Sequence, residues 1–338
     1  MTVTIWGAGS VGLVVGARLA RSGETVHFVC RSSEAARKIN RDGVHFQDAE
    51  SNDGFSVRAS AGSVADASEE RIGNGPVLLC VRTSHTQAAT AALARATSPE
   101  TPVACVQNGL DGEPLVAARF STVIGAVYRQ TCTRRAPNAA VSAGAGRVVL
   151  GLHPEGQHLA VRDLAARIAA AGYVVGVSER IGEDKWLKLC INLMSAPNAL
   201  IRRSDHTTRE FIEIKACLLE EARRVLRAAG IRARSCDGKD RSLEEEIEFQ
   251  RGALERGKSA RELPLYNQVW NALRNGGPVE ADDYHQRIIG LAAAHGVEVP
   301  MNSKMLAALE RAVRRSLGPE SATACEILDT NIEVGQHD

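Results

Sequence analysis

The segment Gly7-Ala8-Gly9-Ser10-Val11-Gly12 near the start of the chain has residue types suited to binding phosphate. It has the pattern GxGxxG, follows a short β-branched run directly, and opens a stretch with helical periodicity. In that context the first glycine permits a tight turn, the second lets the backbone approach a pyrophosphate, and the third allows close helix–strand packing. The helix N-terminus presents unpaired N–H groups to the anion. We therefore predict that this segment binds a dinucleotide.

A cationic residue stands where an NAD enzyme would offer a carboxylate to the ribose. The second predicted strand ends in Val29-Cys30-Arg31-Ser32-Ser33, which contains no acidic residue. A guanidinium can bind a 2′-phosphate through two hydrogen bonds. Arg31 therefore favours NADPH, and Arg82, just past the third predicted strand, adds a second candidate cation on the same side of the site. A solvated arginine at a strand end is the alternative interpretation for each.

An amide side chain follows another predicted strand. Asn108 lies in Gln107-Asn108-Gly109, at the carboxyl edge where open α/β sheets bind ligands. An Asn-Gly pair also forms ordinary turns, which is the alternative. Asn108 is thus a candidate contact for cofactor or substrate.

Two lysines are candidates for acid catalysis. Lys188 and Asn192 are four residues apart in an otherwise apolar segment, which places them on one helix face. A lysine in such surroundings is costly to desolvate unless it meets a carboxylate or a ligand. Lys185 is the rival, and spacing alone does not separate the two. Its neighbour Asp184 favours a solvated surface position for Lys185.

The elements that must position these residues change in character along the chain. Before residue 180, short β-branched runs alternate with Ala-rich segments, which predicts a parallel sheet covered on both faces. The predicted strands are 3–6, 25–30, 76–81, 102–106, 122–125 and 173–177, and the predicted helices are 11–22, 33–41, 85–96 and 157–172. Later segments with apolar stripes predict packed helices at 206–229, 242–256, 280–295 and 302–316. We expect an α/β domain over residues 1–180 and an all-helical domain over 181–338.

Composition narrows the class of partner. The chain has 338 residues, 41 Lys+Arg against 40 Asp+Glu, and 4% aromatic residues, which disfavours nucleic acid or an anionic membrane as partner. Eight cysteines without a CxxC pair disfavour a structural metal site or a disulfide framework. Without a signal segment or a long apolar run, we expect a cytoplasmic protein that acts on a small-molecule substrate and holds no metal.

Taken in order, these motifs resemble those of the 2-dehydropantoate 2-reductases, or ketopantoate reductases. The resemblance spans nearly the whole chain and includes GxGxxG, an arginine after the second strand, Gln-Asn-Gly, Trp-x-Lys-Leu-x-x-Asn, a Glu-x-Asp helix and Gly296-Val297-Glu298-Val299-Pro300-Met301-Asn302. It implies a Rossmann domain followed by a helical domain, with NADPH reducing a 2-oxo acid in the cleft between them.

The resemblance also implies roles for individual residues. Lys188 corresponds to the catalytic lysine, and Glu280 to the carboxylate that helps to hold the substrate and the lysine. Asn108 and Asn192 correspond to polar contacts in the cleft. The natural reaction of such enzymes is the reduction of 2-dehydropantoate to pantoate.

The sequence departs from the family pattern where the substrate is recognised. Pro264 stands near the position of a family serine, extra residues including Gly276-Gly277 precede Glu280, and Ala196 replaces a second asparagine. Tyr266 and Asn267 are candidates to replace the serine as hydrogen-bond donors to substrate, with ordinary packing as the alternative. We therefore expect the cofactor and the lysine to carry over, but not ketopantoate itself.

Other functions fit part of the pattern. An opine-type dehydrogenase shares the plan of the two domains but reduces an imine, and a non-catalytic NADPH sensor would need no substrate contacts. A homodimer formed through the helical domain is a further expectation.

Overall fold

The structure, a computed structural model, describes residues 1–68, 72–256 and 266–329. The chain folds into two compact units, Met1–Lys185 and Trp186–Asp338. The helix α7 (Ile181–Asn192) contains the boundary between them. Among the described residues, no helix is both long and apolar enough to cross a membrane.

The first unit is built on an eight-stranded sheet with the strand order β12-β11-β8-β7-β6-β1-β2-β5. The six strands from β5 to β8 run parallel, in the order of a dinucleotide-binding fold, whereas β11 is antiparallel to β8 and β12 is parallel to β11. The strands are β1 (Thr2–Trp6), β2 (Thr25–Cys30), β5 (Ser60–Ser63), β6 (Val77–Leu79), β7 (Val103–Cys105), β8 (Val123–Arg129), β11 (Arg147–Leu152) and β12 (Val174–Ser178).

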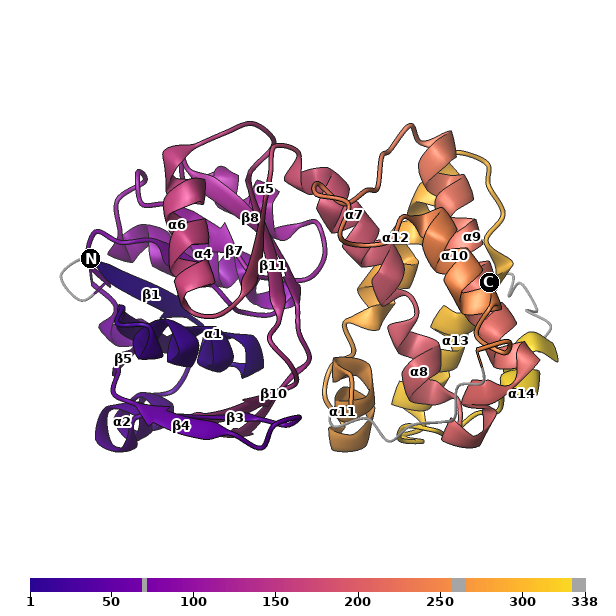
Figure 1. Cartoon of the computed structure of the whole chain (residues 1–338), viewed down its shortest axis with the longest axis horizontal. Helices are drawn as coiled ribbons and strands as arrows, with labels where there is room; N and C mark the ends of the chain where they lie inside the picture. The colour runs from indigo at the N-terminus through magenta and orange to yellow at the C-terminus, as the bar shows by residue number, and fades with distance from the viewer. Residues whose placement is uncertain (69–71, 257–265, 330–338) are drawn as a thin grey trace, which may run out of the picture. The chain divides into compact units, whose positions relative to one another are not determined.

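Helices cover both faces of this sheet (Figure 1). Ile5 and Trp6 are consecutive in β1, so they point to opposite faces, yet both are almost completely buried, in separate apolar clusters. The expected α/β fold with a covered parallel sheet is thus confirmed. The covering helices are α1 (Ser10–Arg21), α2 (Ser33–Asp42), α4 (Thr86–Ala96), α5 (Gly112–Ala117) and α6 (Leu159–Ala170), with short 3-10 turns η1 (Val64–Asp66) and η2 (Thr83–His85).

A second sheet, not predicted from the sequence, packs on α1. Its order is β4-β3-β10-β9, from β3 (Val44–Asp48), β4 (Gly54–Val57), β9 (Cys132–Ala136) and β10 (Ala139–Ser142). The helix α1 contacts β1 and β2 as well as all four of these strands, so it lies between the sheets. Arg18 of α1 places its guanidinium over the rings of Phe46, at 5.2 Å, and Tyr173, at 4.8 Å.

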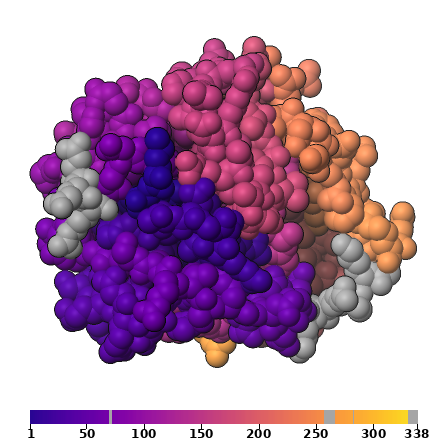
Figure 2. All heavy atoms as spheres, turned by 60° about the vertical axis from the view of Figure 1, so that its left-hand side comes forward, coloured from indigo at the N-terminus to yellow at the C-terminus, as the bar shows by residue number. Residues whose placement is uncertain are grey.

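In the space-filling view, the indigo start of the chain borders the pink segment that contains α6 (Figure 2).

The described part of the second unit consists of helices joined by loops, and its one β-type pairing is an isolated bridge between Ile201 and Ala322. The longest helix, α9, contacts α8, α10, α12, α13 and α14. These segments are the remainder of α7, α8 (Ser195–Leu200), η3 (Arg203–Thr207), α9 (Arg209–Ala228), α10 (Leu243–Arg251), α11 (Gln268–Asn275), α12 (Ala281–Ala294), α13 (Pro300–Arg314) and α14 (Ala324–Asp329).

Candidate functional site

The predicted phosphate-binding loop has the backbone that its glycines require. Gly7 has φ +113°, which L side chains rarely adopt, and its N–H donates to the carbonyl of Val29 at 3.0 Å. A Cβ at Gly12 would collide with the carbonyl oxygen of Gly7. Gly9 differs, because the nearest atom to a Cβ there is the carbonyl oxygen of Cys80 at 3.9 Å. The backbone at Gly9 is therefore open to an incoming group.

The loop ends at the N-terminus of α1, which is suited to an anion. Gly9 is the N-cap residue and, among the described residues, no side chain caps this end. Burial raises the pKa of the neighbouring Cys80 thiol to about 12 and that of Cys30 to about 11. Both thiols therefore stay neutral at pH 7, so neither opposes a phosphate. The residues present fit a dinucleotide pyrophosphate.

Arg31 and Arg82 lie at the carboxyl edge of the sheet, on either side of β1. Arg31 directly follows β2, and Arg82 is the N-cap residue of η2 after β6. Both side chains are exposed. The hydroxyl of Ser32 accepts a hydrogen bond from the N–H of Ala35 at 3.3 Å and so caps α2. Whether either arginine binds the cofactor stays a prediction.

Gln107 is a positioning residue that was not singled out from the sequence. Its side chain is buried, and Nε2 donates to the carbonyl of Val81 at 3.0 Å and to the hydroxyl of Thr86 at 2.6 Å. The hydroxyl of Thr83 donates to the carbonyl of Asn108 at 3.0 Å. Together these bonds join the loops after β6 and β7 and place the half-buried Asn108 at the carboxyl edge. The motif Gln-Asn-Gly contains Gln107, but its spacing does not show which of the two amides is buried.

The expected solvated position of Lys185 is wrong. Lys185 is 6% exposed and forms an ion pair with Glu113 of α5, which is 2% exposed. Asp184 instead accepts a hydrogen bond from the hydroxyl of Ser178 at 2.6 Å. Adjacent residues on a helix do not face each other, so Asp184 carries no information about the surroundings of Lys185. The pair with Glu113 gives Lys185 a structural role within the first unit.

The second unit contains the other candidate catalytic residues. Lys188 and Asn192 are half-buried and lie on one face of α7, next to the fully buried Leu187 and Cys190. Asn192 is the last residue of that helix, and its carbonyl accepts from the hydroxyl of Ser195 at 2.5 Å. Glu280 is half-buried at the N-cap position of α12. The structure thus groups Lys188 with Asn192, and the role of Glu280 beside them stays a prediction.

Tyr266 and Asn267 precede α11 and are bound within the second unit. The hydroxyl of Tyr266 accepts from Nη1 of Arg203 at 3.1 Å, and its ring stacks on Trp270 with centroids 3.9 Å apart. Asn267 Oδ1 accepts from the N–H of Trp270 at 2.8 Å, and Nδ2 donates to the carbonyl of Ser195 at 3.0 Å. Asn267 therefore caps α11 with both ends of its amide in use. Its role toward substrate, and that of Tyr266, stays a prediction.

Two further observations bear on the expected site. Pro264, at the position of the family serine, lies outside the described residues. Within the described ranges, no group of three His, Cys, Asp or Glu side chains could hold a metal ion.

Comparison with known proteins gives consistent matches along the chain. The family model described as ketopantoate reductase PanE/ApbA matches residues 3–155, and the model of its C-terminal part matches residues 180–313. A 2-dehydropantoate 2-reductase of Halobacterium salinarum is 24% identical over 322 residues, which cover 93% of this chain and 99% of that protein.

Solved structures share the fold at low sequence identity. D-mandelate dehydrogenase in a ternary structure with NADH and anilino(oxo)acetate has a TM-score of 0.78 and 16% identity, covering 94% of this chain and 99% of that one. A dimeric ketopantoate reductase from Staphylococcus aureus has a TM-score of 0.72 and 14% identity, covering 94% of this chain and all of that one.

Proposed function

The chain belongs to the ketopantoate reductase PanE/ApbA family, and on that premise we propose that it uses NADPH to reduce a 2-oxo acid or a related carbonyl. The observation that carries the proposal is the open glycine backbone at the N-terminus of α1, which no described side chain caps, in a chain that also keeps Lys188. The first unit would bind the dinucleotide, and the second would supply the acid.

The chemistry divides between cofactor and protein. When bound, the reduced nicotinamide supplies the hydride that the carbonyl carbon accepts. The ammonium of Lys188 donates a proton to the carbonyl oxygen as negative charge develops there, which yields the 2-hydroxy acid and a neutral lysine. Glu280 orients the substrate and favours the ammonium form, and the amides of Asn108 and Asn192 hold polar atoms of the substrate. Lys188 then regains a proton from solvent.

The proposed preference for NADPH over NADH depends on Arg31, the residue that directly follows β2. Family membership supports a nicotinamide cofactor, and the exposed Arg31 in place of an acidic residue supports NADPH. A charge-assisted bond to the 2′-phosphate contributes about 1.5 to 3 kcal/mol, or about 10- to 150-fold in affinity. Equal dissociation constants for NADPH and NADH would contradict this assignment.

The substrate is tested by the oxidation of NADPH in the presence of a panel of 2-oxo acids, ketopantoate among them. Because Ala196 and Pro264 depart from the family pattern, we expect a higher kcat/KM with another 2-oxo acid than with ketopantoate. A missing hydrogen bond to a buried polar group costs about 1 to 3 kcal/mol, enough to change substrate preference. High catalytic efficiency with ketopantoate would overturn this expectation.

Two alternatives predict other outcomes of the same assay. A need for an amine together with the oxo acid would indicate an opine-type dehydrogenase. Tight binding of NADPH without turnover of any substrate would indicate a sensor. The retention of both Lys188 and Glu280 favours the reductase over the sensor.

We also propose a homodimer in the cytoplasm. A neighbour in fold is a dimeric ketopantoate reductase, and eight cysteines without a CxxC pair suit a reducing compartment. Light scattering of the purified chain would show twice the mass of the chain for a dimer.

A further inference from the structure

Arg134 lies beside the phosphate-binding loop, although it is more than a hundred residues away in sequence. It belongs to β9 of the second sheet, and its backbone N–H donates to the hydroxyl of Ser10 at 3.2 Å. Ser10 is the first residue of α1. This bond fixes the backbone of Arg134 next to the helix end at which the dinucleotide is proposed to bind.

The side chain of Arg134 lies on the face of β9 that is turned toward α1. Arg134 is paired with Ala140 of β10, and paired residues of antiparallel strands share a face. Ala140 is buried in the apolar cluster that contains Leu13 of α1. The register of the two strands shifts between Ala139 and Ala140, so Arg135, the next residue, is opposite no residue of β10 and is exposed.

Arg134 is near the end of β2, because it bonds Ser10 and the loop that leads to Ser10 is bonded to β2 through the N–H of Gly7 and the carbonyl of Val29 at 3.0 Å. Its charge lowers the pKa of the Cys30 thiol, against the larger effect of burial, and Cys30 directly precedes Arg31. Arg134 is exposed, and within the described part of the chain its guanidinium forms no hydrogen bond or ion pair. Arg134 therefore brings to this end of α1 a cation to which no anion of the described residues is bound.

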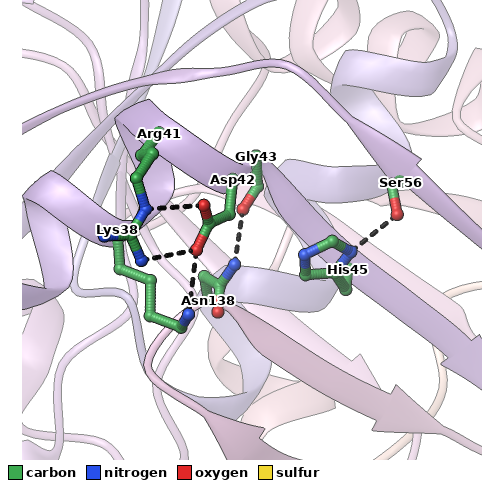
Figure 3. Close-up of polar contacts among 7 residues, drawn as sticks. All are labelled: Lys38, Arg41, Asp42, Gly43, His45, Ser56 and Asn138. Atoms are coloured by element: carbon green, nitrogen blue, oxygen red, sulfur yellow. Dashed lines mark hydrogen bonds and ion pairs between the residues drawn. The ribbon is translucent and has the colours of Figure 1, made fainter.

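Hydrogen bonds join the hairpin of β9 and β10, which carries Arg134, to the segment that follows α2. Asn138, in the turn between β9 and β10, is 1% exposed, and its Nδ2 donates to the carbonyl of Gly43 at 2.8 Å (Figure 3). The N–H of His45 donates to the carbonyl of Asn138 at 2.9 Å. Gly43 ends α2, the helix that begins just after Arg31. The position of Arg134 is therefore held from both ends of the hairpin.

We propose that Arg134 is a specificity residue that, with Arg31, binds the 2′-phosphate of NADPH. The inference rests on the proposed use of NADPH and adds a contribution from the second sheet. Two guanidiniums at the end of β2 would hold a doubly charged phosphate from two sides.

The test is a titration of the full-length protein with NADPH and with NADH, followed by fluorescence of the reduced nicotinamide. We expect Arg134→Ala to weaken NADPH binding by about 10-fold or more and to change NADH binding by less than about twofold, because only NADPH has the 2′-phosphate. Arg134→Lys should keep part of the preference. Arg135→Ala, which removes the neighbouring exposed arginine, is the matched control and should change neither constant.

The titrations distinguish a failure of the proposed use of NADPH from a failure of the proposed role of Arg134. A wild-type protein without preference for NADPH would overturn the proposed cofactor itself. If the wild type prefers NADPH and that preference survives Arg134→Ala, only the role of Arg134 is overturned. An equal loss of NADPH and NADH affinity would also overturn it, because the residue would then act on the pyrophosphate or on the fold. Unchanged thermal unfolding of Arg134→Ala would show that the hairpin is intact.

Discussion

Lys185 and Lys188 lie within one turn of α7, yet their surroundings differ. Lys185 is almost fully buried and paired with Glu113, whereas Lys188 is half-buried on the same face as Asn192. A lysine already bound to a buried carboxylate is a poor proton donor to substrate, because giving up the proton would leave the carboxylate without a counter-charge. Lys185 is therefore a poor candidate for the catalytic acid, and Lys188 stays the residue we propose for that role.

Lys188→Ala should lower kcat by about 10²- to 10⁴-fold with little effect on cofactor affinity, since a positioned general acid contributes about that much. Initial rates at saturating NADPH, with the preferred 2-oxo acid, give the measurement. Glu280→Gln keeps the shape of the side chain and removes its charge, so it should impair turnover and change the pH profile in a different way. Near-normal kcat for Lys188→Ala would show that the proton comes from elsewhere.

Lys185→Ala should act on stability instead. Removal of one partner from a buried ion pair leaves the Glu113 carboxylate uncompensated and costs about 3 to 5 kcal/mol. Chemical denaturation should show this loss, while the folded fraction keeps kcat. Exchange of the exposed Lys239 for alanine is the control for loss of a lysine charge. A folded Lys185→Ala protein of normal stability but without turnover would reverse the roles of the two lysines.

At the scale of elements, the start of α13 depends on a buried polar network. Glu221 of α9 accepts hydrogen bonds from the N–H groups of Met301 and Asn302 at 2.8 and 2.9 Å, and from Nδ2 of Asn302 at 2.8 Å. Oδ1 of Asn302 therefore faces His285, so Nδ1 of His285 carries the proton in their 2.9 Å bond. Nε2 of His285 is buried without a partner among the described residues. The ring is thus held neutral.

This network predicts a dependence of stability on pH. Burial lowers the pKa of His285 from 6.5 to about 4. The contribution of the neutral ring to the free energy of unfolding is fully present above about pH 6.5. It is lost as the pH falls toward 4, because the unfolded chain binds the proton more tightly than the folded chain does. At about 1.4 kcal/mol per pKa unit, the loss is about 3 kcal/mol. Urea unfolding at several pH values measures it.

The matched variant for this experiment is His285→Gln, whose amide can keep the bond to Asn302 but does not titrate. Its free energy of unfolding should fall less steeply than that of the wild type over the same pH range. Identical slopes would assign the acid sensitivity to other groups.

At the scale of the whole molecule, the division into two compact units predicts where cofactor stabilises the chain. NADPH at about 100 times its dissociation constant should raise the free energy of unfolding of the Met1–Lys185 unit by about 2.7 kcal/mol. Hydrogen exchange of the full chain should show protection around Gly7 to Gly12 and in β9. Protection confined to the second unit would contradict the proposed binding loop.

The sequence predicted several strands with apolar runs that are buried, such as Thr25–Cys30, because burial leaves a strong pattern, but it missed β11, whose run Val148–Leu150 is also buried. It did not predict β9, in which Arg134 and Arg135 interrupt any apolar run, or β4, whose sequence GFSV is short and partly exposed. Such strands are defined by partners far away in the chain.

The sequence predicts only the part of the candidate site that local motifs define. The pattern GxGxxG could be recognised because the spacing of its glycines within one short segment indicates phosphate binding. The pair between Lys185 and Glu113, and the placement of Arg134 at Ser10, depend on tertiary contacts that no spacing records.

The pairing of β3 with β10 has a consequence for synthesis on the ribosome. His45 pairs with Ala139, so the hairpin of β3 and β4 emerges long before the strand that completes its sheet. A two-stranded hairpin is marginally stable alone, and its open edge can pair with other chains. At translation rates of about 5 to 20 residues per second, the nascent chain carries this open edge for on the order of ten seconds. During that interval the open edge of β3 is available to a chaperone that binds unpaired strand edges.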